Sequence, residues 1–124
     1  SEKDVWEVLK RHNVNPHPCY RAGWNRCSCA MCIFSTPKLF AGIRELYPED
    51  YALLKKDEEI LGFTLDNKCD LDTFVGDAES CVYHGDLAAI HSLVTGEFTA
   101  DDVYVKENWM YPAGAFHGAE GGPC

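Results

Sequence analysis

The stretch from residue 13 to residue 35 constrains this chain most, because it combines proline breaks with clustered cysteines. Pro16 and Pro18 restrict the residues before them and cannot donate backbone hydrogen bonds, so we expect an irregular loop here. A loop of this length is uncommon inside a compact domain unless it is functional or cross-linked. A bound metal ion would supply such a cross-link.

Four of the seven cysteines fall within this loop, and the other three are scattered. The N-terminal residues do not resemble a secretion signal, so we expect a cytoplasmic protein without a disulfide framework. The spacing of the CxxC unit at Cys29 and Cys32 lets two thiolates bind one ion. Four thiolates bind Zn²⁺ or an iron–sulfur cluster. The candidate metal ligands are Cys29, Cys32, Cys19 and Cys27.

The cysteine loop leaves several interpretations open. His17, on the turn between the two prolines, or Cys124, at the end of the chain, would serve as an outside ligand. The thiols of Cys29 and Cys32 would alternatively be redox-active. In a third interpretation the cysteines are buried and behave as small hydrophobic residues.

The charge of the chain is unevenly distributed. Residues 1–44 hold seven Lys or Arg against three Asp or Glu, whereas the remaining residues hold four against seventeen. The net charge of −9 disfavours nucleic acid as a partner, and no apolar run is long enough to span a membrane. Any bound anion is therefore expected beside the basic cysteine loop, held by Arg21, Arg26 and Lys38 and by a helix N-terminus near residue 36.

The chain is long enough for a single domain, which we assign to residues 1–124. The predicted fold is mainly α with irregular loops and a few short strands. A helical hairpin is expected over residues 36–62, because Thr36 is a good N-cap, Pro48 separates two apolar repeats and Gly62 is a helix stop. Further helices are expected over residues 4–12, with Asp4 as N-cap, and over residues 85–95. Residues 63–65, 73–75 and 103–105 are the candidate strands.

The sequence contains none of the common nucleotide, metalloprotease or hydrolase motifs. Residues 17–35, HPCYRAGWNRCSCAMCIFS, resemble a segment of phosphoadenosine phosphosulfate (PAPS) reductase-like proteins of the bacterial and phage branch. The following hairpin, the GFT at residues 62–64 and the closing PAGAFHGAEGGPC are also similar to the C-terminal half of that branch.

This resemblance implies a two-part protein. The family carries an N-terminal α/β domain that binds an adenine sulfonucleotide or ATP through a Ser-Gly-Gly-x-Asp-Ser loop. No such loop occurs in this sequence, so the resemblance implies the C-terminal region of a larger protein, with that nucleotide-binding domain as its partner. The closing EGGPC also differs from the family's Glu-Cys-Gly-[Leu/Ile]-His motif, which carries its catalytic cysteine.

Two functional hypotheses follow from these observations. In the first, the chain is part of an oxidoreductase or sulfurtransferase of sulfur metabolism that acts on a small-molecule sulfonucleotide, and it is inactive alone. Its cysteine loop would then hold zinc or an iron–sulfur cluster. In the second, the chain is a non-catalytic interaction module that a metal stabilises.

Overall fold

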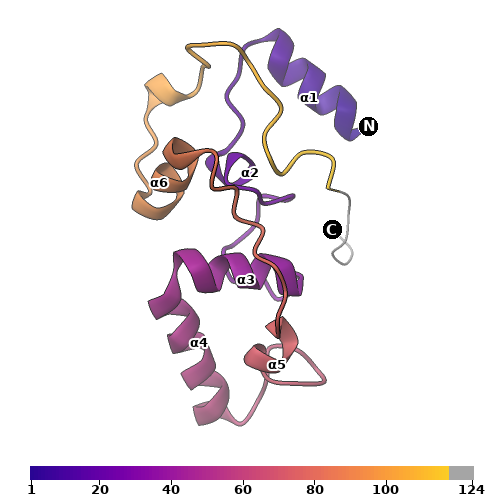
Figure 1. Cartoon of the computed structure of the whole chain (residues 1–124), viewed down its shortest axis with the longest axis vertical. Coiled ribbons are helices and arrows are strands. Elements are labelled where there is room, and N and C mark those ends of the chain that lie inside the picture. Colours follow the sequence, from indigo (N-terminus) through magenta and orange to yellow (C-terminus); the bar gives the residue numbers. More distant parts are fainter. Residues whose placement is uncertain (118–124) are drawn as a thin grey trace. The chain divides into compact units, whose positions relative to one another are not determined.

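The computed structural model describes residues 1–117 and is mainly helical, as the sequence predicts (Figure 1). The chain divides into two compact units. Unit 1 comprises residues 1–27 and the described part of residues 82–119, and unit 2 comprises residues 28–81. No helix within residues 1–117 combines the length and the apolar composition needed to cross a membrane.

Unit 1 is built from two segments that lie far apart in the sequence. Its helix α2 packs against α6, and Trp6, Trp24 and Ala89 are among its buried side chains. The helices of unit 1 are α1 (Glu2–Arg11), α2 (Pro18–Arg21), α6 (Leu87–Thr95) and the short 3₁₀ helix η1 (Ala100–Asp102).

The start of helix α1 differs from the sequence prediction. Asp4 was expected to be the N-cap, but the cap is Ser1, and Asp4 is the third helical residue. Its carboxylate accepts hydrogen bonds from the Ser1 hydroxyl and terminal amine, both at 2.8 Å. This reciprocal arrangement is a capping box, which satisfies backbone N–H groups in the first turn. The helix therefore begins at Glu2, earlier than the sequence predicts.

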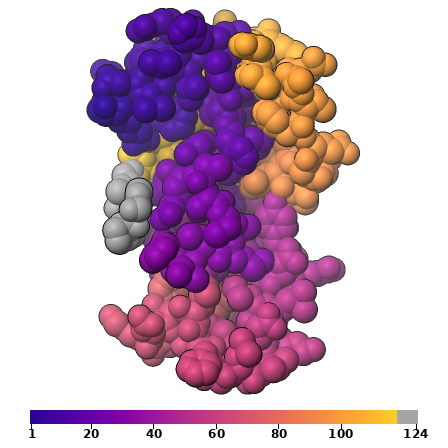
Figure 2. Space-filling view, turned by 180° about the vertical axis from the view of Figure 1, so that it is seen from behind, coloured from indigo at the N-terminus to yellow at the C-terminus, as the bar shows by residue number. Residues whose placement is uncertain are grey.

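Long-range hydrogen bonds join the two segments of unit 1. The backbone amide of Asn15 donates to the Val103 carbonyl at 2.8 Å, and the indole of Trp109 donates to the Val14 carbonyl at 2.8 Å. The Glu2 carboxylate accepts from the indole of Trp6 and, at 2.8 Å, from the Phe116 amide. In Figure 2 the indigo-to-violet surface of the N-terminal segment adjoins, at the top of the view, the orange surface of the second segment of unit 1.

Unit 2 contains the predicted hairpin, formed by α3 (Pro37–Leu46) and α4 (Pro48–Leu61). The Thr36 hydroxyl caps α3 by accepting from the Leu39 amide, and Gly62 ends α4 in the left-handed conformation at φ +68°. Helix α3 supplies more of the core of this unit than any other helix, since Leu39, Phe40, Ala41 and Ile43 are all buried. The prediction for residues 36–62 is confirmed.

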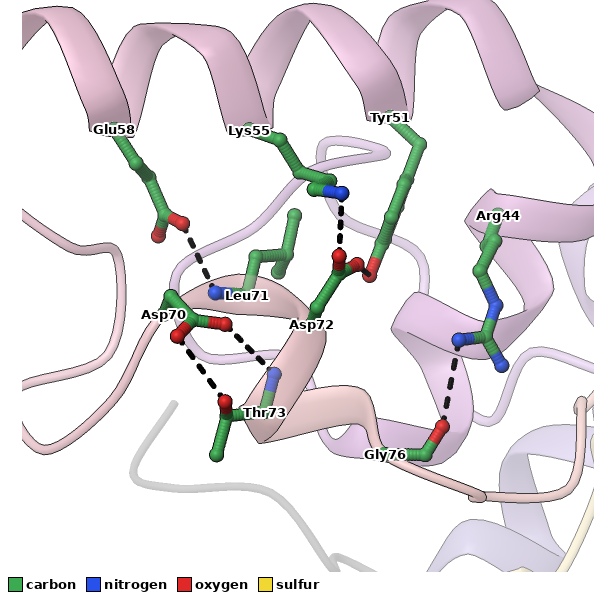
Figure 3. Close-up of polar contacts among 9 residues, drawn as sticks. All are labelled: Arg44, Tyr51, Lys55, Glu58, Asp70, Leu71, Asp72, Thr73 and Gly76. Atoms are coloured by element: carbon green, nitrogen blue, oxygen red, sulfur yellow. Dashed lines mark hydrogen bonds and ion pairs between the residues drawn. The ribbon is translucent and has the colours of Figure 1, made fainter.

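A third helix of unit 2, α5 (Leu71–Val75), occupies the residues for which the sequence predicted an extended segment. The Asp70 carboxylate caps it by accepting from the Thr73 amide at 2.8 Å. Figure 3 shows how α4 holds it: Tyr51 donates to Asp72, Lys55 pairs with Asp72, and Glu58 accepts from the Leu71 amide. These contacts outweigh the β propensity of a short Thr-Phe-Val run.

The predicted short strands do not occur in residues 1–117. Residues 63–65 have no regular structure, and the segment 103–105 forms only an isolated bridge between Val14 and Tyr104. The helix predicted over residues 85–95 is confirmed as α6, which Asp86 caps and Gly96 ends.

Candidate metal centre

Three side chains with metal-binding chemistry meet in unit 1. The potential ligand atoms of His17, Cys19 and Cys27 all lie within 4.8 Å of one another. Cys19 is buried, whereas His17 and Cys27 are exposed. One imidazole and two sulfurs are donors that zinc accepts, so this group can hold a metal ion.

Helix α2 positions two of these residues. His17 is its N-cap, Pro18 occupies the first helical position, and Cys19 is the second helical residue. Proline fits this position because its missing N–H has no partner in the first turn of a helix. The His-x-Cys spacing around Pro18 therefore brings an imidazole and a thiol to the same helix end.

Tyr20 and its neighbours position the third residue. The chain turns back after α2, with the Trp24 amide donating to the Cys19 carbonyl at 2.9 Å. The Cys27 amide then donates to the phenol oxygen of Tyr20 at 3.2 Å. The ring of Tyr20 packs edge-on against Trp6, with ring centroids 5.2 Å apart.

The second segment of unit 1 supports this turn through Gly114. The Gly114 amide donates to the Tyr20 carbonyl at 2.8 Å. A Cβ atom at this glycine would lie only 1.8 Å from the Trp24 carbonyl oxygen, so no larger residue fits without a shift of backbone. The turn that carries Cys19 and Cys27 thus depends on a close backbone approach from the far end of the sequence.

Burial raises the pKa of the Cys19 thiol strongly, and the neighbouring Cys27 raises it further. A desolvated thiolate next to a second sulfur is unfavourable when no cation balances its charge. A divalent cation reverses this situation, because coordination stabilises the thiolate and releases its proton. The site is therefore electrostatically suited to a cation.

His17 already uses one ring nitrogen. Its Nδ1 accepts a hydrogen bond from the Cys19 amide at 3.2 Å, so in the neutral imidazole the proton is on Nε2. Coordination through Nδ1 would use the same lone pair, and coordination through Nε2 would move the proton to Nδ1. Metal binding by His17 would therefore replace its hydrogen bond from the Cys19 amide, which caps α2, with a bond to the metal.

The four ligands predicted from the sequence are divided between the two units. The structure brings Cys19 and Cys27 together with His17, which the sequence offered as an alternative ligand. Cys29 is exposed and Cys32 is buried, both in unit 2, and their role as ligands stays a prediction. Cys124 lies outside the described residues. The signal for this group in the sequence is the His-x-Cys spacing at residues 17–19, at the start of α2, and the CxxC motif at residues 29–32 does not include it.

The predicted anion-binding residues are not equivalent. The guanidinium of Arg21 pairs with the Asp86 carboxylate, with its Nε at 3.0 Å and its NH2 nitrogen at 3.4 Å. Since Asp86 also caps α6 through the Ala89 amide, this pair joins α2 to α6 and offsets the charge of Arg21. Arg26 is partly buried and Lys38 is exposed, and their role stays a prediction.

Comparisons with known proteins give one similarity and no family. No family model matches the chain, and no solved structure matches it. The chain is 31% identical, over 61 residues, to a protein of Escherichia phage 186 described as "Uncharacterized 37.8 kDa protein in gpa 5'region". The match covers 49% of this chain but only 18% of the phage protein.

Proposed function

We propose that unit 1 is a zinc-stabilised module in which His17, Cys19 and Cys27 bind the ion. The observation that carries this proposal is the convergence of their three ligand atoms within 4.8 Å. Structural zinc sites combine cysteine sulfur and histidine nitrogen in this way. The ion would cross-link α2 to the turn that follows it, in a segment that has little other regular structure.

The donor set favours zinc over an iron–sulfur cluster. Clusters are usually held by four cysteines, and the Rieske type has two cysteines and two histidines. The group in unit 1 instead has one histidine and two cysteines. Zinc sites tolerate such mixed sets and usually take a fourth ligand.

The direct test is metal analysis of the 124-residue chain together with its visible spectrum. We expect a colourless protein that contains one zinc ion per chain. Cys19→Ser and Cys27→Ser should each lower the zinc content, because each removes a sulfur ligand. Cys69→Ser is the matched control, since Cys69 lies on a loop of unit 2 and should be dispensable.

Other outcomes would replace this proposal. A brown protein that absorbs near about 400 nm would indicate an iron–sulfur cluster. A metal-free protein whose thiols all react freely would rule out both kinds of centre. Loss of zinc in Cys29→Ser or Cys32→Ser, but not in Cys19→Ser, would move the site to the CxxC unit.

A second proposed function is sulfonucleotide chemistry, which the resemblance of residues 17–35 to PAPS reductase-like proteins supports. In this case basic side chains, predicted from the sequence as Arg21, Arg26 and Lys38, contact the anionic substrate, and another domain binds most of the nucleotide. Arg26 in unit 1 and Lys38 in unit 2 are each tested separately. Titration of the chain with PAPS, followed by NMR, should shift the amide signals near these two residues. Arg26→Ala and Lys38→Ala should each remove the shifts. Unchanged spectra, or reductase activity of this chain alone, would contradict this proposal.

A further inference from the structure

The two sulfurs of the candidate metal centre are also close enough to react with each other. Cys19 and Cys27 are both free cysteines, and their sulfur atoms lie within 4.8 Å. A side-chain hydrogen bond also joins them. A disulfide bond is about 2.0 Å long, so the two sulfurs must still move closer before they can bond.

The two cysteines differ in their access to reagents. Cys27 is exposed, whereas Cys19 keeps only 8% of its surface accessible. A small oxidant in solution therefore meets Cys27 first. Cys19 lies beside it and can attack the resulting adduct as the resolving thiol, slowly, because burial raises its pKa and exchange requires the thiolate.

We propose that Cys19 and Cys27 form a reversible disulfide by exchange with a low-molecular-weight disulfide such as glutathione disulfide. In the first step the Cys27 sulfur bonds to one glutathione sulfur, and the other glutathione leaves and takes the Cys27 proton. In the second step the Cys19 sulfur attacks the Cys27 sulfur, and the remaining glutathione leaves with the Cys19 proton. The two cysteines are oxidised, and glutathione disulfide is reduced to two thiols.

The surrounding hydrogen bonds allow this reaction without unfolding. The Trp24 amide holds the Cys19 carbonyl, and the Tyr20 phenol holds the Cys27 amide. Both bonds involve backbone groups, and neither uses a sulfur atom. These two bonds therefore need not break for the sulfur atoms to change partners.

Metal and disulfide compete for the same sulfur atoms. A coordinated thiolate is not available to attack a disulfide, so bound zinc should protect both cysteines. This competition rests on the proposed zinc site, whereas the disulfide itself does not. Unit 1 would thus have a reduced, metal-binding form and an oxidised, metal-free form.

The test uses the full chain, stripped of metal and incubated with glutathione disulfide. Free thiols are then alkylated, and the cross-linked peptides are identified by mass spectrometry. We expect one internal disulfide, between Cys19 and Cys27, that dithiothreitol reverses. In Cys19→Ser the reaction should stop at a glutathione adduct on Cys27, and Cys69→Ser, outside the candidate metal centre, should behave like the unchanged chain. Zinc added in excess should slow the reaction about tenfold or more.

The outcomes separate this inference from the proposed function. A disulfide from Cys27 to Cys29 or Cys32, or full alkylation of Cys19 after oxidation, would overturn the inference even if zinc binds. A Cys19–Cys27 disulfide in a chain that takes up no zinc would support the inference and contradict the proposed metal site.

Discussion

Units 1 and 2 of this chain are stabilised in different ways. Within residues 1–117, unit 2 is one continuous stretch whose helices begin and end at local signals, with Thr36 and Pro48 at starts and Gly62 at an end. Unit 1 joins two segments through hydrogen bonds that cross most of the sequence, such as the bond from the Phe116 amide to Glu2. Local signals make a unit predictable from sequence, whereas long-range bonds make it dependent on the rest of the chain. A metal cross-link is therefore expected to matter more in unit 1.

The largest effect should come from removing the metal. Zinc-dependent peptides gain on the order of 10 kcal/mol from their ion, so a chelator should loosen unit 1 and leave unit 2 folded. Hydrogen exchange measures both units in one experiment. The amides of Trp24 and Gly114, which bond within unit 1, should exchange about 100-fold faster or more, and that of Ile43 should not change.

The outcome that contradicts this first prediction is equally specific. If the amides of both units accelerate together, the units do not differ in their dependence on metal. Cys27→Ser should reproduce the effect of the chelator on unit 1, and Cys69→Ser, in unit 2, serves as its control.

The next largest effect should follow from Gly114→Ala. The new methyl group would overlap the Trp24 carbonyl oxygen, at 1.8 Å in the present backbone, and should destabilise unit 1 by about 3 kcal/mol. Gly62→Ala is the comparison in unit 2, where φ is +68° but nothing lies within 4 Å. It should cost about 1 kcal/mol through backbone strain alone. Equal losses in urea unfolding would show that the close approach at Gly114 is unimportant.

A smaller effect is expected from Glu58→Ala in unit 2. The Glu58 carboxylate accepts from the Leu65 amide at 2.7 Å and so fixes the loop before α5. It also accepts from the Leu71 amide at 2.9 Å (Figure 3). Removing it leaves two donors without this partner and should cost about 2 kcal/mol. The exposed neighbour Glu59 is the control, and its change to alanine should stay within about 0.5 kcal/mol. Thermal unfolding measures the stability of both variants, and equal losses would contradict this role of Glu58.

The smallest effect concerns pH. The hydrogen bond from Lys55 lowers the pKa of Asp72 below its usual 3.8, and Tyr51 adds to this effect. Since the folded pKa is the lower one, the contribution to stability is present above about pH 4 and is lost as pH falls through the folded pKa. Asp72 is half exposed, so its contribution should be about 0.5 kcal/mol. Asp72→Asn should flatten the acid part of the stability curve, measured by urea unfolding, and Asp57→Asn should leave it unchanged.

Sequence-based prediction succeeded where local signals fix an element and failed where contacts from other segments do. The hairpin of unit 2 could be predicted because capping residues, prolines and a helix-ending glycine act within a few residues. Helix α5 could not, because Thr73–Val75 favours an extended chain locally and contacts from α4 decide otherwise. At the candidate site, Cys19 and Cys27 were among the predicted ligands, but their pairing with His17 depends on a turn held by Tyr20 and Gly114. No local pattern encodes that turn.

The interrupted construction of unit 1 has a consequence for the order of events during synthesis. His17, Cys19 and Cys27 all lie in its first segment, so the ribosome releases them before any of unit 2 and long before Gly114. Unit 2 can fold next, because its contacts lie within one stretch. An ion captured early would hold α2 and its turn together during translation until the second segment arrives to cover them. The metal would then act as a temporary substitute for a part of the protein not yet made.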